Sequence, residues 1–244
     1  MATSINTNYG AAVALQSLNK TSQQLETTQN RISTGMKVSS AKDNGAIFSI
    51  ATSQRATAAS QDAVRAGLQR TQSITDVALA AGDTITSALE EMKSLSVSIA
   101  SSTGSAQTAY LADFNALGTE IASAITGASF DSVNSLTTPL ASLSTLTAGN
   151  LNAAAATTAA VDTAIGTVTG ALATLGTQSK SLGRQITFVN KLQDAMEAGV
   201  GNLVDADLAK ESAKLTALQT KQQLGVQALS IANQGSSILL SLFR

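Results

Sequence analysis

The sequence predicts an all-α fold: a long antiparallel helical rod, with terminal coiled-coil helices and a short β-hairpin or turn region in the middle. Three observations predict this class. Apolar residues recur every three or four positions over most of the 244 residues, which is the period of one helix face. The single proline, Pro139, leaves the remaining chain free to be helical. Aromatic residues are only 3% of the chain, and small residues bury little area each, so an extended helical protein is favoured over a globule.

The first segment, residues 1–38, is predicted to be the amino-terminal half of a coiled coil. Its large aliphatic residues are Ile5, Leu15, Leu18, Leu25 and Ile32. The last three are seven residues apart, which is the heptad spacing of a helix seam. Gly35 is expected to end this helix as a C-cap. Ser40 and Asp43 have the spacing of a capping box, so the next helix is expected to restart near Ala41.

The middle segment, residues 39–200, is predicted to be a helical rod. A stripe with spacings of three and four runs from Val64 to Ile99, and another from Val161 to Val189, so the two faces are expected to pack antiparallel. Gly104 should interrupt the first stripe, and a short helix should follow from Leu111 to Ile125. The stretch from about 127 to 150 is rich in turn residues and contains Pro139, which indicates a hairpin with turns.

The last segment, residues 201–244, mirrors the first in length and polarity and is predicted to be the carboxyl-terminal half of the coiled coil. We expect a break at residues 199–202. The apolar residues of this segment are Val204, Leu208, Leu215, Leu218, Leu229, Leu239 and Leu242. Both ends are rich in Ser, Thr, Asn and Gln, and long isolated helices of that composition are unstable. We therefore expect both ends to be disordered in the monomer and helical only among neighbouring subunits.

Composition argues against an enzyme. The chain has no His and no Cys, so imidazole bases, thiolate nucleophiles and the usual zinc ligands are missing. The adjacent acids Asp205 with Asp207 and Glu90 with Glu91 point in different directions on a helix and are interpreted as solvated surface. We therefore expect no catalytic residues, no cofactor-binding residues, no metal ligands and no cofactor.

Charge and hydropathy limit the partners. A net charge of −1 gives no long-range attraction to nucleic acid or to an anionic membrane. The Ala-rich run from 151 to 175 is interrupted by Asn152, Asp162 and many Thr residues, so no membrane insertion is expected. The start of the chain lacks the basic and apolar regions of a cleaved signal, so export would need another route.

Paired motifs at the two ends resemble bacterial flagellin, in a short form without the variable outer domains. At the amino end the matching motifs are Ser4-Ile-Asn-Thr-Asn8, Leu18-Asn-Lys20, Arg31-Ile-Ser-Thr-Gly35 and Ser39-Ser-Ala-Lys-Asp-Asn-Gly-Ala46. At the carboxyl end they are Asp205-Ala-Asp-Leu-Ala-Lys-Glu211, Gln227-Ala-Leu-Ser-Ile-Ala-Asn-Gln234 and Leu239-Leu-Ser-Leu-Phe-Arg244. The run Phe130-Asp-Ser-Val-Asn-Ser-Leu136 departs from the Phe-Asn-Gly turn that is frequent in the family, which leaves the turn type open.

The resemblance implies a structural subunit that polymerises into the flagellar filament, the extracellular propeller of swimming bacteria. It implies that the apolar residues of both ends lie in a concentric inner core. The implied partners are many copies of the same chain, the flagellar type III export apparatus, an export chaperone, the filament cap and the hook-junction proteins. The last helix is the expected chaperone surface, because it is apolar and unpaired before assembly.

The resemblance also marks three candidate contacts for the innate immune receptor of flagellin: Glu91, Leu95 and Glu120. Flagellins that this receptor detects carry Arg where this chain has Glu91. Reversal of that charge opposes binding to an acidic receptor surface, so we expect weak or absent activation.

Two alternative functions stay open at the level of sequence. A hook–filament junction protein has similar termini but would not form long filaments alone. A soluble coiled-coil module for signalling or adhesion would account for the heptads, but not for the paired terminal motifs.

Overall fold

The all-α class is confirmed by the computed structural model, which describes the backbone of residues 8–242 and the side chains of residues 8–234. The described helices are α1 (Tyr9–Thr34), α2 (Gly45–Ser101), α3 (Gly104–Gly127), a 3-10 turn (Ala141–Thr145), α4 (Thr158–Val204) and α5 (Leu208–Leu242). The strands β1 (Ser129–Phe130) and β2 (Val133–Asn134) form a small antiparallel hairpin. The chain divides into two compact units, residues 1–59 with 194–244, and residues 60–193.

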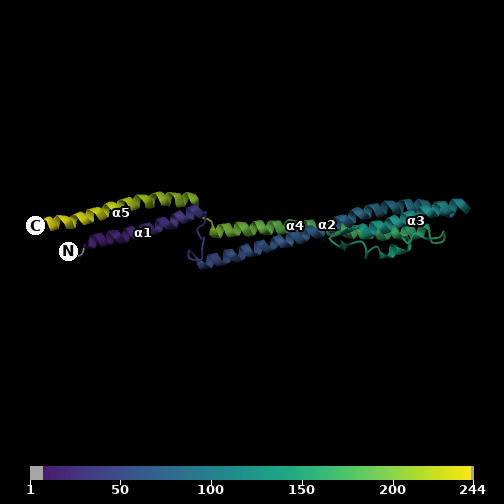
Figure 1. Ribbon diagram of the computed structural model, residues 1–244, viewed down its shortest axis with the longest axis horizontal. Coiled ribbons are helices and arrows are strands. Elements are labelled where there is room, and N and C mark those ends of the chain that lie inside the picture. The colour runs from purple at the N-terminus through teal and green to yellow at the C-terminus, as the bar shows by residue number, and fades with distance from the viewer. Residues whose placement is uncertain (1–7, 243–244) are drawn as a thin grey trace. The chain divides into compact units, whose positions relative to one another are not determined.

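The unit that contains both ends of the chain is built on α1 and α5, which lie side by side and antiparallel (Figure 1). Residues near the start of α1 contact the end of α5, since the Asn8 side-chain amide donates to the Ala232 carbonyl at 2.8 Å. At the other end, Arg31 pairs with Glu211. Gly35 ends α1 in the left-handed conformation at φ 70°, as the sequence predicts.

The second unit, residues 60–193, contains the larger hydrophobic core. Here α2 and α4 run antiparallel: the Gln72 side-chain amide donates to Ser179 Oγ at 2.6 Å, and Lys93 pairs with Asp162. α3 and the segment after the hairpin complete the core. Its buried side chains include Ala78, Ile85, Leu89, Met92, Ile99, Phe114, Ile121, Leu136, Leu140, Leu143, Val161, Val168 and Leu175. The antiparallel packing predicted from the two stripes is therefore present.

The hairpin predicted within residues 127–150 is present, and its turn is of a defined type. Phe130 pairs with Val133 across two residues, Asp131 and Ser132. Both turn residues have positive φ, 51° and 63°, which is the type I′ arrangement that matches the twist of a two-residue hairpin. Neither is glycine, so Asp131 and Ser132 form this turn with two non-glycine residues in the left-handed region.

Two helix boundaries differ from the sequence expectation. α2 begins at Gly45 rather than near Ala41, because the Asp43 carboxylate reaches back to Ser39 and Ser40. Asn44 acts as the cap instead, and its side-chain oxygen accepts from the Ile47 amide at 3.1 Å. Capping by Asn is as favourable as capping by Ser.

The break expected at residues 199–202 is wrong. α4 continues through Gly199 and Gly201 to Val204, so the predicted boundary after residue 200 falls inside a helix. Val200 and Val204 are buried beside Ala51 in a small second core. Burial of these two valines outweighs the low helix propensity of the glycines.

By length and composition alone, α4 could also cross a membrane. A single such helix is weak evidence, because a helix that packs in a soluble core passes the same test. Val161, Val168 and Leu175 of this helix lie in the core of residues 60–193.

Candidate assembly surface

A heptad seam joins α1 to α5. Residues on the facing sides are buried or half-buried at alternating spacings of three and four. On α1 they are Ala11, Ala14, Leu18, Thr21, Leu25, Thr28 and Ile32, and on α5 they are Glu211, Leu215, Leu218, Gln222, Gly225, Leu229 and Ala232. This pattern is that of an antiparallel two-stranded coiled coil.

The seam is unusually polar and small. Thr21 and Thr28 are the buried residues of α1, and Thr28 Oγ1 has no hydrogen-bond partner. A β-carbon on Gly225 would lie 3.3 Å from Leu18 Cδ1, so the small residue permits close approach of the helices. Because Thr, Gln and Gly bury little apolar area, the pair gains little free energy from its own seam.

One ion pair lies within this seam. Arg31 Nη1 is 2.9 Å from Glu211 Oε1, and the side chain of Glu211 is only 12% exposed. The second oxygen of Glu211 is buried without a hydrogen bond, and Lys214 Nζ lies 3.9 Å from it. A carboxylate buried to this extent needs a cation nearby, so Arg31 is the group that makes Glu211 tolerable at this position.

A backbone junction ties the end of α1 to the start of α5. The amide of Lys37 donates to the Val204 carbonyl at 2.6 Å, and the amide of Ala206 donates to the Gly35 carbonyl at 2.9 Å. Met36 and Asp205 form an antiparallel bridge. Met36 and Ile47 pack against the small core of Ala51, Val200 and Val204. The junction therefore sets the register from which both terminal helices extend.

The loop after this junction is organised around Asp43. One carboxylate oxygen accepts from the amides and the hydroxyls of Ser39 and Ser40, at 3.0–3.1 Å. These hydrogen bonds, led by that from the Ser40 amide, lower the pKa of Asp43 below its usual value. Hydrogen bonds of this kind favour the charged form, so the loop geometry depends on an ionised Asp43.

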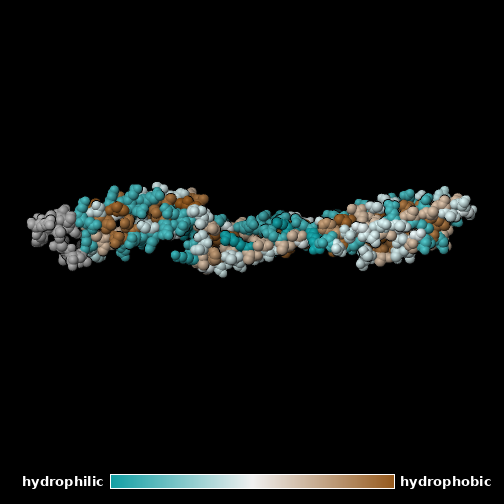
Figure 2. Space-filling model, in the orientation of Figure 1, coloured by the Kyte–Doolittle hydropathy of each residue, from teal (hydrophilic) through white to brown (hydrophobic). Residues whose placement is uncertain are grey.

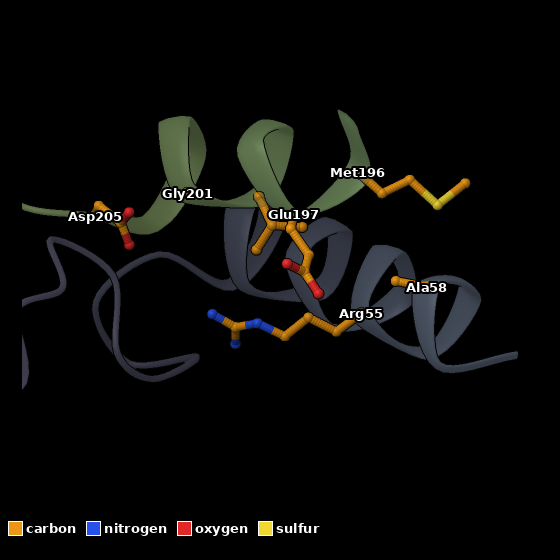
Figure 3. Close-up of a pocket in the computed structure, with 7 residues that line it drawn as sticks. Arg55, Ala58, Met196, Glu197, Gly201 and Asp205 are labelled. Atoms are coloured by element: carbon orange, nitrogen blue, oxygen red, sulfur yellow. The ribbon is translucent and has the colours of Figure 1, made fainter. Parts of the chain in front are cut away.

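A cavity of about 320 Å³ lies beside the junction, between α2 and α4 (Figure 3). Arg55 and Glu197 project into it from opposite helices, and Met196 points away along α4. Arg55 Nη2 is 4.0 Å from Met36 Sδ. Among the residues that the structure describes, no group of three or more His, Cys, Asp or Glu side chains is arranged to hold a metal ion.

Outside the seam, the two terminal helices expose large apolar side chains, and Figure 2 shows apolar residues among polar ones on this pair. On α1 these are Tyr9, Val13 and Leu15, and on α5 they are Leu208, Leu224, Val226 and Ile231, with Ile231 69% exposed. Leu224 and Ile231 are seven residues apart and so lie on one side of α5. Exposed apolar surface of this extent is typical of protein–protein interaction sites.

The predicted interface residues divide into four groups. Those brought together in the seam are Leu18, Leu25, Ile32, Leu215, Leu218 and Leu229, while Val204 lies in the small core. Leu15 and Leu208 are about half exposed, at 49% and 48%. Ile5 lies outside the described residues, and the side chains of Leu239 and Leu242 lie outside the described part of α5.

Sequence reasoning missed several exposed apolar residues, namely Tyr9, Val13, Leu224, Val226 and Ile231. Leu224 and Ile231 are seven residues apart, and this heptad spacing outside the seam stripe is the signal that could have revealed them. The candidate receptor residues Glu91 and Glu120 are exposed, whereas Leu95 is half-buried against the core of residues 60–193.

Comparisons with known proteins identify the family of this chain. Residues 5–139 match the bacterial flagellin N-terminal helical region, and residues 158–243 match the bacterial flagellin C-terminal helical region. The chain is 52% identical to flagellin FljK of Caulobacter vibrioides, over 99% of this chain and 98% of that protein. It is 37% identical to a flagellin of Brucella melitensis, over 99% of both chains.

These matches span both ends and the middle of the chain in a single colinear alignment. They do not favour a hook-junction protein or an unrelated coiled-coil module. This chain belongs to the bacterial flagellin family and is a structural subunit of the flagellar filament.

Proposed function

We propose that polymerisation proceeds through the terminal helices α1 and α5 of the predicted segments 1–38 and 201–244, and that these helices form the inner core of the filament. Residues 39–200 then form the rod outside that core. The observation that carries this proposal is the apolar surface that α1 and α5 leave exposed after they have packed on each other, with Leu224 at 59% and Ile231 at 69%. Since neither helix of the pair covers these side chains, neighbouring subunits are the partners that bury them.

The same surface supports the expectation that both ends order on assembly. A seam that contains two buried threonines, Gln222 and Gly225 gains little free energy, and fixing each backbone residue costs about 1–2 kcal/mol. Contacts with neighbouring copies supply the missing burial. Slow amide exchange in α1 of a verified monomer would contradict this.

Seeded polymerisation tests the proposal. The variant Leu224→Ser/Ile231→Ser removes exposed apolar area without touching the seam, so we expect seeds to elongate at least about tenfold more slowly. Gln223→Ala/Ser230→Ala is the matched control, because both residues are exposed, seven apart and on the same turns of α5. Elongation of both variants at the wild-type rate would overturn the assignment.

A subunit that assembles outside the cell must first be exported. The proposed route is the flagellar type III apparatus, with an export chaperone that covers α5, and with the filament cap and the hook-junction proteins as later partners. The exposed apolar side of α5 supports the chaperone surface, because an unassembled chain must keep it from other partners. Co-purification of the chain with a chaperone, lost in Leu224→Ser/Ile231→Ser, is the expected result.

Weak activation of the innate flagellin receptor is proposed for this chain. Glu91 and Glu120 are exposed, so an acidic side chain stands at the position where detected flagellins carry Arg. Like charges at an interface oppose association. Reporter cells should respond weakly to the wild type and more strongly to Glu91→Arg; a full response to the wild type at ordinary flagellin doses would contradict the proposal.

A further inference from the structure

A row of cations lies on the exposed side of α4. Lys180, Arg184 and Lys191 are all exposed, and Phe188 lies among them with 65% of its surface accessible. Spacings of four, four and three residues place them on one side of the helix. We call these four residues the basic stripe.

The basic stripe faces away from α2. The side of α4 that packs is marked by buried Leu175 and Val189, by Ser179, which contacts Gln72, and by Gln193, whose amide donates to Asp62 at 3.2 Å. On a helical projection these positions lie roughly opposite Lys180, Arg184 and Lys191. The stripe is therefore not part of the α2–α4 packing.

The cations of α2 in the same unit differ from the basic stripe because they form ion pairs. Arg65, Arg70 and Lys93 are each paired with an aspartate, namely Asp62, Asp131 and Asp162. The structure gives no ion pair to the cations of the basic stripe within the described residues. Phe188 and Arg184 are of residue types that are enriched at interfaces, and the row of cations around them is available to a partner of opposite charge.

A complementary row of acids lies on α2. Asp76, Asp83 and Glu90 are exposed and seven residues apart, so they lie along one side of the helix. We call them the acidic stripe; Asp76 also accepts a hydrogen bond from Gln72 at 3.1 Å. At 1.5 Å per residue the acidic stripe is about 21 Å long and the basic stripe about 16 Å. The two rows are therefore similar in length and opposite in charge.

The two stripes approach each other at one end only within a chain. Ser179 donates to Asp76 at 3.5 Å and Gln193 donates to Asp62 at 3.2 Å, so residues 180–191 run alongside residues 64–75 of α2. Asp83 and Glu90 lie further along α2, towards Lys93, where α4 contributes Asp162. The stripes are thus displaced along the helix pair and come close only where Asp76 lies near Ser179, and no ion pair joins them within the described residues.

We propose that the basic stripe of one subunit docks on the acidic stripe of a second copy of this chain, as a contact between the rods of neighbouring subunits in the filament. Phe188 packs at the centre of the contact and excludes water from the surrounding charges. The inference rests on self-polymerisation and adds to it a surface in residues 60–193, separate from the terminal helices. Charge complementarity of this kind sets the register and the rate of association more than the final affinity.

Charge exchange tests the contact in the full-length chain. Lys180→Glu/Arg184→Glu/Lys191→Glu should slow seeded elongation at least about tenfold, and so should Asp76→Lys/Asp83→Lys/Glu90→Lys. The chain that carries all six substitutions restores complementarity and the net charge of −1, so it should elongate close to the wild-type rate. Circular dichroism of each variant checks that the helices are retained.

A matched control separates the stripe from net charge. The three basic-stripe reversals combined with Glu91→Lys/Asp113→Lys/Glu120→Lys also have a net charge of −1, but these acids are exposed residues outside the acidic stripe. This chain should stay slow. Recovery in the control as well as in the sixfold exchange would show a net-charge effect and overturn the proposal.

Other outcomes also decide the question. The basic-stripe reversal could elongate seeds at the wild-type rate but lose the ability to bind vesicles of anionic lipid. That result would assign the stripe to a membrane surface and overturn the contact between copies. If the Leu224→Ser/Ile231→Ser chain fails to elongate seeds but the basic-stripe reversal elongates them normally, assembly through α1 and α5 is supported and the contact between the stripes is refuted. Normal elongation by both variants would refute both proposals.

Discussion

Arg31 and Glu211 show how one residue pair controls the terminal helices. Glu211 occupies a seam position where the equivalent residues one, two and three heptads later are Leu218, Gly225 and Ala232. A carboxylate at such a position is expensive to bury unless a cation neutralises it. Arg31 provides that charge at 2.9 Å, and the backbone junction around Gly35 holds the two helix ends in the matching register.

Arg31→Gln should therefore destabilise the α1–α5 pair by about 1–3 kcal/mol, because Glu211 would be left buried with only a distant lysine. The temperature at which assembled filaments melt should fall accordingly. Lys214→Gln is the control: this lysine is 47% exposed and 3.9 Å from Glu211, so its loss should cost less than about 0.5 kcal/mol. Equal melting temperatures for both variants would show that the buried pair contributes nothing.

The stability of the loop around Asp43 should depend on pH. Its folded pKa is lower than the ordinary value of 3.8, so the unfolded loop binds a proton more readily than the folded loop. The stabilisation by Asp43 is present above the unfolded pKa and is lost as the pH falls through the folded pKa. Amide exchange at Ser39 and Ser40 should accelerate below about pH 4 relative to neighbouring loop amides. In Asp43→Asn this acid-induced change should vanish; its persistence would place the effect on another group.

At the scale of elements, Gly118 determines how closely α3 approaches the segment after the hairpin. This buried glycine lies where an added β-carbon would be 2.5 Å from the backbone oxygen of Leu146. A backbone atom cannot move aside as a flexible side chain does. Without Gly118, α3 could not approach this segment so closely.

Gly118→Ala should destabilise the folded chain by about 1–3 kcal/mol, despite the better helix propensity of alanine. Gly166→Ala on α4 should act in the opposite direction, because nothing lies within 4 Å of its added β-carbon. There the gain in helix propensity of up to about 1 kcal/mol is uncompensated. Thermal unfolding of the two variants should shift to opposite sides of the wild type, and shifts of the same sign would contradict the packing argument.

At the scale of the whole molecule, stability is divided between the two compact units. Every residue of the larger core lies between Ala78 and Leu175. The terminal unit has a smaller core of Ala51, Val200 and Val204, and its long helices meet along a polar seam. Removing the ends should therefore abolish assembly while leaving the larger core intact.

The fragment of residues 60–193 should fold with a cooperative thermal transition and fail to elongate seeds. Circular dichroism and seeded polymerisation measure the two properties separately. A fragment that lacks cooperative unfolding would show that the terminal unit supports the larger core. A fragment that elongates seeds would show that the terminal helices are dispensable for assembly.

Much of the fold could be predicted from local pattern. Heptad spacing of Leu18, Leu25 and Ile32 identifies the side of α1 that packs, and Gly35 identifies its end, because both depend on residues close together in the sequence. The two boundary errors have different causes. α4 continues past Gly199 because Val200 and Val204 are buried against Ala51, which is distant in the sequence. The start of α2 moves for a local reason, because the Asp43 carboxylate accepts hydrogen bonds from Ser39 and Ser40 and Asn44 caps the helix instead.

By itself, the sequence determined the all-α class, the antiparallel α2–α4 packing, the hairpin and the membership of the flagellin family, since apolar periodicity and paired terminal motifs are local properties. Only the tertiary structure decided which apolar residues remain available for other copies. Leu18 and Leu224 look alike in sequence, yet Leu18 packs against α5 whereas Leu224 is 59% exposed. The physical reason is that a side chain is buried or exposed according to which helix lies opposite, and that depends on contacts between residues about 200 positions apart.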